Sequence, residues 1–144
     1  MNKTGPIIVI DDDKDDCDII NTVYANLKYQ NKLLTFNEGR EALEYLQIGN
    51  IQPFIIISDI YMKKISGFEL RAMIHSDENL RIKCIPYLFF TSGDATSHLV
   101  TTAYSMSIQG FFQKPTTYDE MRDLLVHIIE YWKRGMTPGR FKVW

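Results

Sequence analysis

The stretch Ile7-Ile-Val-Ile-Asp-Asp-Asp-Lys-Asp-Asp16 joins a short apolar run to a cluster of five carboxylates. The apolar part does not alternate polar with apolar residues, and most of its side chains are β-branched. Such a run is typical of a strand that is covered on both faces, as in a parallel sheet. The acids that follow it predict a polar site at the end of that strand.

Similar runs recur along the chain, at Phe54–Ile57, Tyr87–Phe90 and Gly110–Phe112, and the half-polar Leu33–Phe36 is a fifth candidate strand. Helical periodicity fills the gaps between the runs. The expected helices are Asp15–Lys28, Arg40–Gln47, Gly67–His75, Thr96–Ser105 and Tyr118–Trp132, with Asp13 as an N-cap and Ile19, Ile20, Val23 and Leu27 facing the core. Strand and helix thus alternate five times, which predicts an α/β fold with a doubly wound parallel sheet.

Composition limits the classes of protein that the chain can belong to. Its 144 residues fit one domain, with 45% hydrophobic and 24% charged residues. The formal net charge of -2 gives no basic footprint for nucleic acid. No run approaches the ~18 apolar residues of a membrane span, and none resembles a signal-peptide core, so we expect a cytoplasmic protein with no membrane partner. Cys17 and Cys84 are expected to be reduced thiols.

The residues at the strand ends carry the chemistry, because ligands of open α/β sheets bind there. They are Asp11, Asp12 and Asp13 after the first strand, Ser58 and Asp59 after the third, Thr91 and Ser92 after the fourth, and Gln113, Lys114 and Pro115 after the fifth. Clustered carboxylates need a cation to stay ionised together, and oxygen-only ligands favour Mg²⁺. A metal, a lysine and a hydroxyl can offset the charge of a transferring phosphoryl group, and a carboxylate can accept that group.

Four segments resemble the receiver domains of response regulators. They are the Ile7–Asp16 stretch, Ile55–Met62 with Ser66-Gly67, Ile85–Ser92, and Gly110–Pro115. The resemblance covers residues 5–132 and leaves a C-terminal tail at 133–144. It implies a flavodoxin-like (βα)5 fold with strand order 2-1-3-4-5. The long stretch Ser76–Cys84 and the acidic run also resemble the stand-alone receivers that work with phytochrome-like and other hybrid histidine kinases.

The resemblance assigns roles residue by residue. Asp59 matches the phosphoacceptor, and Thr91 and Lys114 match the hydroxyl and the lysine that contact the phosphoryl oxygens. The metal, Mg²⁺ with Mn²⁺ as a substitute, would be held by Asp11, Asp12, Asp59 and the backbone carbonyl of Tyr61. Thr91 and Phe111 match the switch pair, and Pro115 matches a proline that is usually cis.

Three positions depart from the family pattern. Lys63 stands where the family usually has Pro, and Ser66 where it usually has Asp, so we expect a less rigid and more basic loop after Asp59. Ser107 stands where Gly is frequent, and a left-handed backbone there would cost up to ~1 kcal/mol. None of the three residues is a predicted ligand.

The function expected from the resemblance is that of a single-domain response regulator. It would accept a phosphoryl group from a histidine kinase or a phosphotransfer protein and then bind an unknown downstream protein, as a monomer or weak homodimer. It would catalyse only its own phosphotransfer and dephosphorylation. A pseudo-receiver that binds without phosphorylation is the alternative. A phosphatase would need a second Asp two residues after the nucleophile, and that residue is Tyr61.

Overall fold

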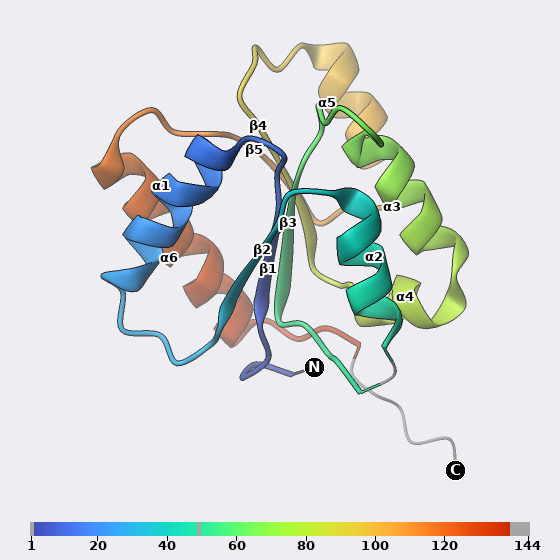
Figure 1. Ribbon diagram of the computed structural model, residues 1–144, viewed down its shortest axis with the longest axis horizontal. Coiled ribbons are helices and arrows are strands. Elements are labelled where there is room, and N and C mark those ends of the chain that lie inside the picture. Colours follow the sequence, from blue (N-terminus) through green and yellow to red (C-terminus); the bar gives the residue numbers. More distant parts are fainter. Residues whose placement is uncertain (1, 49, 139–144) are drawn as a thin grey trace.

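The computed structural model describes residues 2–48 and 50–138. Its elements, in chain order, are β1 (Ile7–Ile10), α1 (Lys14–Ala25), β2 (Leu33–Phe36), α2 (Gly39–Gln47), β3 (Ile55–Asp59), α3 (Gly67–Ser76), α4 (Glu78–Lys83), β4 (Tyr87–Thr91), α5 (Ser97–Tyr104), β5 (Gly110–Gln113) and α6 (Tyr118–Arg134). Figure 1 shows the five strands as a central layer between two layers of helices.

The sheet is parallel throughout, in the order β2-β1-β3-β4-β5. Strand order reverses at β1, so the loops that follow β1 and β3 leave the sheet on opposite sides. The register pairs Ile10 with Ser58 and Thr91 with Gln113. The carboxyl ends of these strands therefore lie level with one another. The predicted fold class and strand order are confirmed.

Both faces of the sheet are buried, as the continuous apolar runs predicted. One core packs Ile8, Ile10, Ile56 and Phe89 beneath α2, α3, α4 and α5, and the other packs Ile7, Val9, Ile57 and Phe90 beneath α1 and α6. In Figure 1 these two groups of helices lie on opposite sides of the sheet. Removing large aliphatic and aromatic side chains from water on two faces is the main stabilising contribution of such a sheet.

Several boundaries differ from the sequence predictions. Asp59 and Thr91 are the last residues of their strands, not the residues after them. Ile19, expected in the core, is 48% exposed, because the buried stripe of α1 runs through Cys17, Ile20 and Val23. The predicted N-cap Asp13 is confirmed, since its carboxylate accepts hydrogen bonds from the Asp15 and Asp16 amides.

An additional helix, α4, lies in the long stretch between α3 and β4, so the pattern is not a strict fivefold repeat of strand and helix. Asp77 caps it by accepting hydrogen bonds from the Asn79 and Leu80 amides, and Leu80 anchors it to the core. Just after it, the peptide bond before Pro86 is cis. The bond before Pro115 is not, contrary to the expectation from the family.

Helix α6 ends at Arg134, with Gly135 as its C-cap, so it includes the first two residues of the expected tail at 133–144. Residues 139–144 of the expected tail lie outside the described residues. No helix in the described part of the chain is both long and apolar enough to cross a membrane.

Candidate functional site

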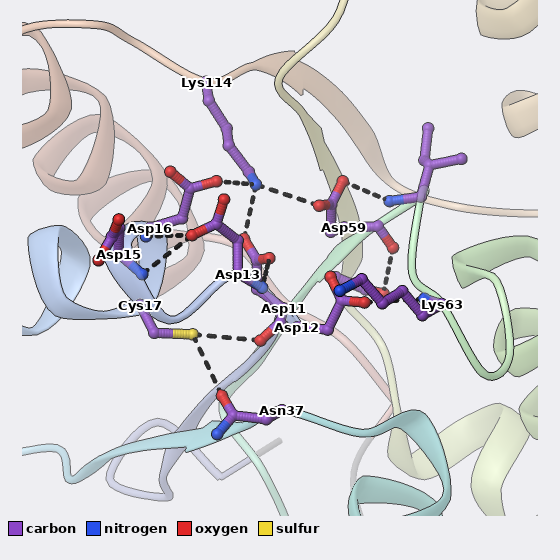
Figure 2. Close-up of polar contacts among 12 residues, drawn as sticks. Asp11, Asp12, Asp13, Asp15, Asp16, Cys17, Asn37, Asp59, Lys63 and Lys114 are labelled. Atoms are coloured by element: carbon purple, nitrogen blue, oxygen red, sulfur yellow. Dashed lines mark hydrogen bonds and ion pairs between the residues drawn. The ribbon is translucent and has the colours of Figure 1, made fainter.

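A single ammonium group connects the strand ends. Lys114, which follows β5, places Nζ 2.6 Å from Asp11 Oδ2, 2.8 Å from Asp16 Oδ2 and 3.2 Å from Asp59 Oδ2. Figure 2 shows the lysine reaching from β5 toward the acids that follow β1 and β3. The ends of three strands thus meet in one ion-paired cluster, as the sequence predicted.

The cluster is largely removed from water. The side chains of Lys114 and Asp59 are 6% exposed and that of Asp11 is 2% exposed. Burial raises the pKa of Asp11 to about 6, although the hydrogen bond from Lys114 opposes this shift. Burial also tends to lower the pKa of Lys114. The bonds to Asp11 and Asp16 outweigh that effect, so the pKa rises and the lysine stays protonated.

Asp59 is oriented by the backbone of the loop that follows it. Its Oδ1 accepts a hydrogen bond of 2.7 Å from the Ile60 amide, which leaves Oδ2 facing Lys114. Helix α3 begins directly against this loop, where the Gly67 amide donates to the Ile60 carbonyl at 2.7 Å. A Cβ on Gly67 would lie 2.1 Å from the Asp59 carbonyl oxygen, so the close approach requires glycine.

Asp12 lies beside the cluster and points away from Lys114, toward the loop after β3 (Figure 2). Its Oδ2 accepts a hydrogen bond of 2.8 Å from the Lys63 backbone amide. A proline at position 63, as is usual in the family, has no such donor. Ser66, the second departure, forms a capping box with Glu69 at the start of α3. Both departures thus place hydrogen bonds in the loop that was expected to be less rigid.

The predicted switch residues lie close to the cluster but outside it. Thr91 is fully buried at the end of β4, and its Oγ1 has no hydrogen-bond partner among the described residues. Its carbonyl accepts from the Lys114 amide at 2.8 Å, which fixes the lysine segment to β4. Phe111 is half-buried and packs against the core under α5. Tyr61 exposes 62% of its surface, and its carbonyl is a predicted ligand that remains a proposal.

Asp16 is not among the predicted site residues, although it lies in the acidic run. The structure places its carboxylate against Lys114. A signal was present in the sequence. Asp16 lies four residues before Ile20 and seven before Val23, so it continues the buried stripe of α1 back to the strand ends.

The donor set fits a hard cation. Asp11, Asp12 and Asp59 lie at the same end of the sheet and carry carboxylate oxygens, which are the ligands that Mg²⁺ and Mn²⁺ prefer. In the described residues no three His, Cys, Asp or Glu side chains already form a ligand cluster. Lys114 lies between Asp11 and Asp59, and the Lys63 amide holds Asp12. A hollow lined by Asp12, Asn37, Met62 and Lys63, among others, opens beside the cluster.

The chain is similar in sequence to known proteins. Residues 7–126 match the family model of the response regulator receiver domain. The probable methanogenesis regulatory protein FilR2 of Methanothrix harundinacea is 25% identical over 130 residues, which are 88% of this chain and 82% of that protein.

Two solved structures share the fold. The phosphorylated cyanobacterial phytochrome response regulator RcpA superposes with a TM-score of 0.81 at 24% identity, covering 94% of this chain and 99% of that one. The Mn²⁺-bound form of response regulator Rcp1 gives a TM-score of 0.77 at 21% identity, with the same coverage. From the family match and the shared fold, we conclude that this chain belongs to the response regulator receiver domain family of two-component signalling.

Proposed function

We propose that this receiver, over residues 5–132, accepts a phosphoryl group on Asp59 in a reaction that depends on Mg²⁺. The observation that carries the proposal is the buried Asp59 carboxylate, whose Oδ2 faces the Lys114 ammonium at 3.2 Å. RcpA, whose structure is that of a phosphorylated protein, and Rcp1, whose structure holds Mn²⁺, support it by analogy.

The donor would be a phosphohistidine of a histidine kinase or of a phosphotransfer protein. An Asp59 oxygen attacks the phosphorus, the new O–P bond forms, and the P–N bond to the donor imidazole breaks. The electron pair of that bond leaves with the imidazole, which takes up a proton. The chain thus acts as a phosphoacceptor and catalyses no reaction apart from its own phosphorylation and dephosphorylation.

The charge of the transferring group is what the site must offset. Lys114 supplies a fixed positive charge, and the buried Thr91 hydroxyl has a donor free for a phosphoryl oxygen. Asp11, Asp12 and the Tyr61 carbonyl would hold the metal together with Asp59. A bound Mg²⁺ supplies further positive charge beside the phosphoryl group. The two exposed lysines of the loop, Lys63 and Lys64, line the hollow through which an anionic donor would approach.

Acetyl phosphate tests the proposal. With Mg²⁺, intact mass spectrometry should show one added phosphoryl group on the wild type and none on Asp59→Asn. Asp13→Asn is the matched control, because Asn also caps helices and Asp13 makes no ion pair with Lys114 within the described chain. Unchanged labelling of Asp59→Asn would refute the role of Asp59. An unlabelled wild type would favour a pseudo-receiver that binds partners without phosphorylation.

The metal assignment needs its own test. Asp12→Asn should weaken Mg²⁺ binding and leave the fold intact, because Asp12 is a half-buried side chain outside both cores. Mg²⁺ titrations followed by amide NMR shifts measure this affinity directly. Equal affinity in the wild type and Asp12→Asn would remove Asp12 from the set of ligands.

A further inference from the structure

We propose that Asp16 is a positioning residue: it holds the Lys114 ammonium in the unphosphorylated protein and is exchanged for a phosphoryl oxygen when Asp59 is phosphorylated. The inference rests on the proposed function and adds a residue that the family resemblance does not assign. Its starting point is the 2.8 Å ion pair between Lys114 Nζ and Asp16 Oδ2, which joins β5 to the first turn of α1 (Figure 2).

Counting donors shows why an exchange is needed. A lysine ammonium has three N–H donors and no acceptor. In this structure three carboxylates, those of Asp11, Asp16 and Asp59, already surround Nζ at 2.6–3.2 Å. A phosphoryl oxygen that bonds Lys114 must therefore take the place of one of these acceptors. The acceptor that leaves must then be hydrated or paired elsewhere.

Asp16 is the acceptor that can leave at least cost. Its side chain is 29% exposed, whereas that of Asp11 is 2% exposed and that of Asp59 is 6% exposed. A carboxylate near the surface recovers water when its partner departs, but a buried one would be left charged and unpaired. Asp11 is also held by its bond from the Asp13 amide. Asp59 stays beside Lys114, because the phosphoryl group is joined to one of its own oxygens.

The same geometry predicts the sign of the effect. While Asp16 holds Nζ, it draws the ammonium toward α1 and competes with any anion bound at Asp59. Removing its charge should leave Lys114 free to contact that anion. Asp15→Asn is the matched control, because Asp15 lies in the same first turn of α1 and loses the same charge. Asp15 is exposed and is not among the carboxylates paired with Lys114 in the described chain.

The first measurement uses metal-free protein and does not depend on phosphorylation. NMR of the Lys114 ammonium group reports how fast its protons exchange with water. We expect slow exchange in the wild type and Asp15→Asn and faster exchange in Asp16→Asn, because the Asn oxygen can still accept from the ammonium but lacks the charge that strengthens the bond. Equal exchange rates in all three proteins would overturn the holding role of Asp16.

The second measurement uses beryllofluoride with Mg²⁺ as a phosphoryl mimic, detected by ¹⁹F NMR. Asp16→Asn should bind it roughly two- to fivefold tighter than both the wild type and Asp15→Asn, the range typical of a partly exposed ion pair. If the wild type, Asp15→Asn and Asp16→Asn all bind beryllofluoride with the same affinity, the exchange is overturned but the proposed function is not. A wild type that binds no beryllofluoride overturns the proposed function and the exchange together, and the metal-free measurement still decides whether Asp16 holds Lys114.

Discussion

At the scale of single residues, the site depends on one lysine that pairs with several acids. Asp11, Asp16 and Asp59 carry three formal negative charges against the single positive charge of Lys114. A divalent cation would offset the excess negative charge. It would let these neighbouring carboxylates stay ionised together. Asp12 adds a fourth acid whose orientation is set by a backbone amide instead of by a cation.

If Asp12 is a metal ligand as proposed, the Lys63 amide would compete with the metal for its carboxylate. Lys63→Pro deletes that donor, so Mg²⁺ should bind roughly three- to tenfold tighter. This gain is smaller than the full free energy of a hydrogen bond to a charged group, because water takes the place of the lost amide donor. Lys63→Ala removes the same side-chain charge and keeps the amide, so it isolates the contribution of the hydrogen bond. Mg²⁺ titration by NMR measures all three affinities, and equal values for the Pro and Ala variants would contradict this account.

At the scale of elements, Arg71 ties α3 to the turn between α5 and β5. It is 1% exposed, and its Nε and Nη2 donate to the Met106 and Ser107 carbonyls at 3.0 and 2.9 Å. Its guanidinium lies over the Tyr87 ring, 4.9 Å from the centroid. Ser107 has a φ of 60°, so this serine does adopt the left-handed backbone whose cost was considered for this position. The bonds from Arg71 and Gln109 to its carbonyl hold that conformation.

Arg71→Lys should lower the free energy of unfolding by roughly 1–3 kcal/mol. The charge stays buried, but an ammonium cannot reproduce the planar fork that serves two carbonyls and stacks on Tyr87. Arg40→Lys, at an exposed position of α2, is the control and should change stability by less than about 0.5 kcal/mol. Urea unfolding of both variants decides the matter. Equal midpoints would show that the clamp contributes nothing to stability.

The predicted switch residues Thr91 and Phe111 lie on the neighbouring strands β4 and β5. The Thr91 hydroxyl, buried and unpaired in the described chain, is free to donate to a phosphoryl oxygen and draw its loop inward. Turning Phe111 further in contributes at most roughly 1.5–3 kcal/mol, and the ring is already half-buried here. Changing the ratio of the switched to the unswitched conformation from 1:99 to 99:1 needs about 5.5 kcal/mol. The Thr91 and Lys114 contacts must therefore supply the rest.

Thr91→Ala should therefore accept phosphate but lose most of the conformational response, and Phe111→Ala should keep part of it. The response is read as NMR shifts on α5, including His98, Thr101, Thr102 and Tyr104, with and without beryllofluoride. A complete wild-type pattern of shifts in Thr91→Ala would show that the coupling runs by another route.

At the scale of the whole molecule, the site lies at the carboxyl edge of the sheet, at the opposite end from the N-terminus (Figure 1). Several charged side chains are buried at that edge. The free-energy cost of burying them should appear in the free energy of unfolding of the whole protein. Ionising Asp11 in the folded protein is unfavourable, because burial raises its pKa from 3.8 to about 6. The stabilisation that comes from protonated Asp11 is complete below its pKa in the unfolded protein. It is lost as pH rises through its pKa in the folded protein.

In metal-free protein, the stability of the wild type relative to Asp11→Asn should therefore fall as pH rises from about 4 to about 6 and then level off. Chemical denaturation of both proteins at several pH values gives this difference, and it removes the contributions of other acids that the two proteins share. A difference that stays constant or rises over this interval would show that the Lys114 bond outweighs burial.

The sequence by itself determined the α/β class, the five strands and the acids, hydroxyl and lysine at their ends. Strand chemistry is local: continuous apolar runs such as Ile7–Ile10 must be covered on both faces, and the residues that follow them in a parallel sheet share an edge. Only the tertiary structure decided that Asp16 pairs with Lys114, that the Lys63 amide holds Asp12, and that Arg71 clamps a distant turn. Those contacts join residues between 35 and 98 positions apart. Such contacts depend on how packed elements bring side chains within ~3 Å. A local pattern can place Asp16 on the buried stripe of α1, but it cannot name Lys114 as its partner.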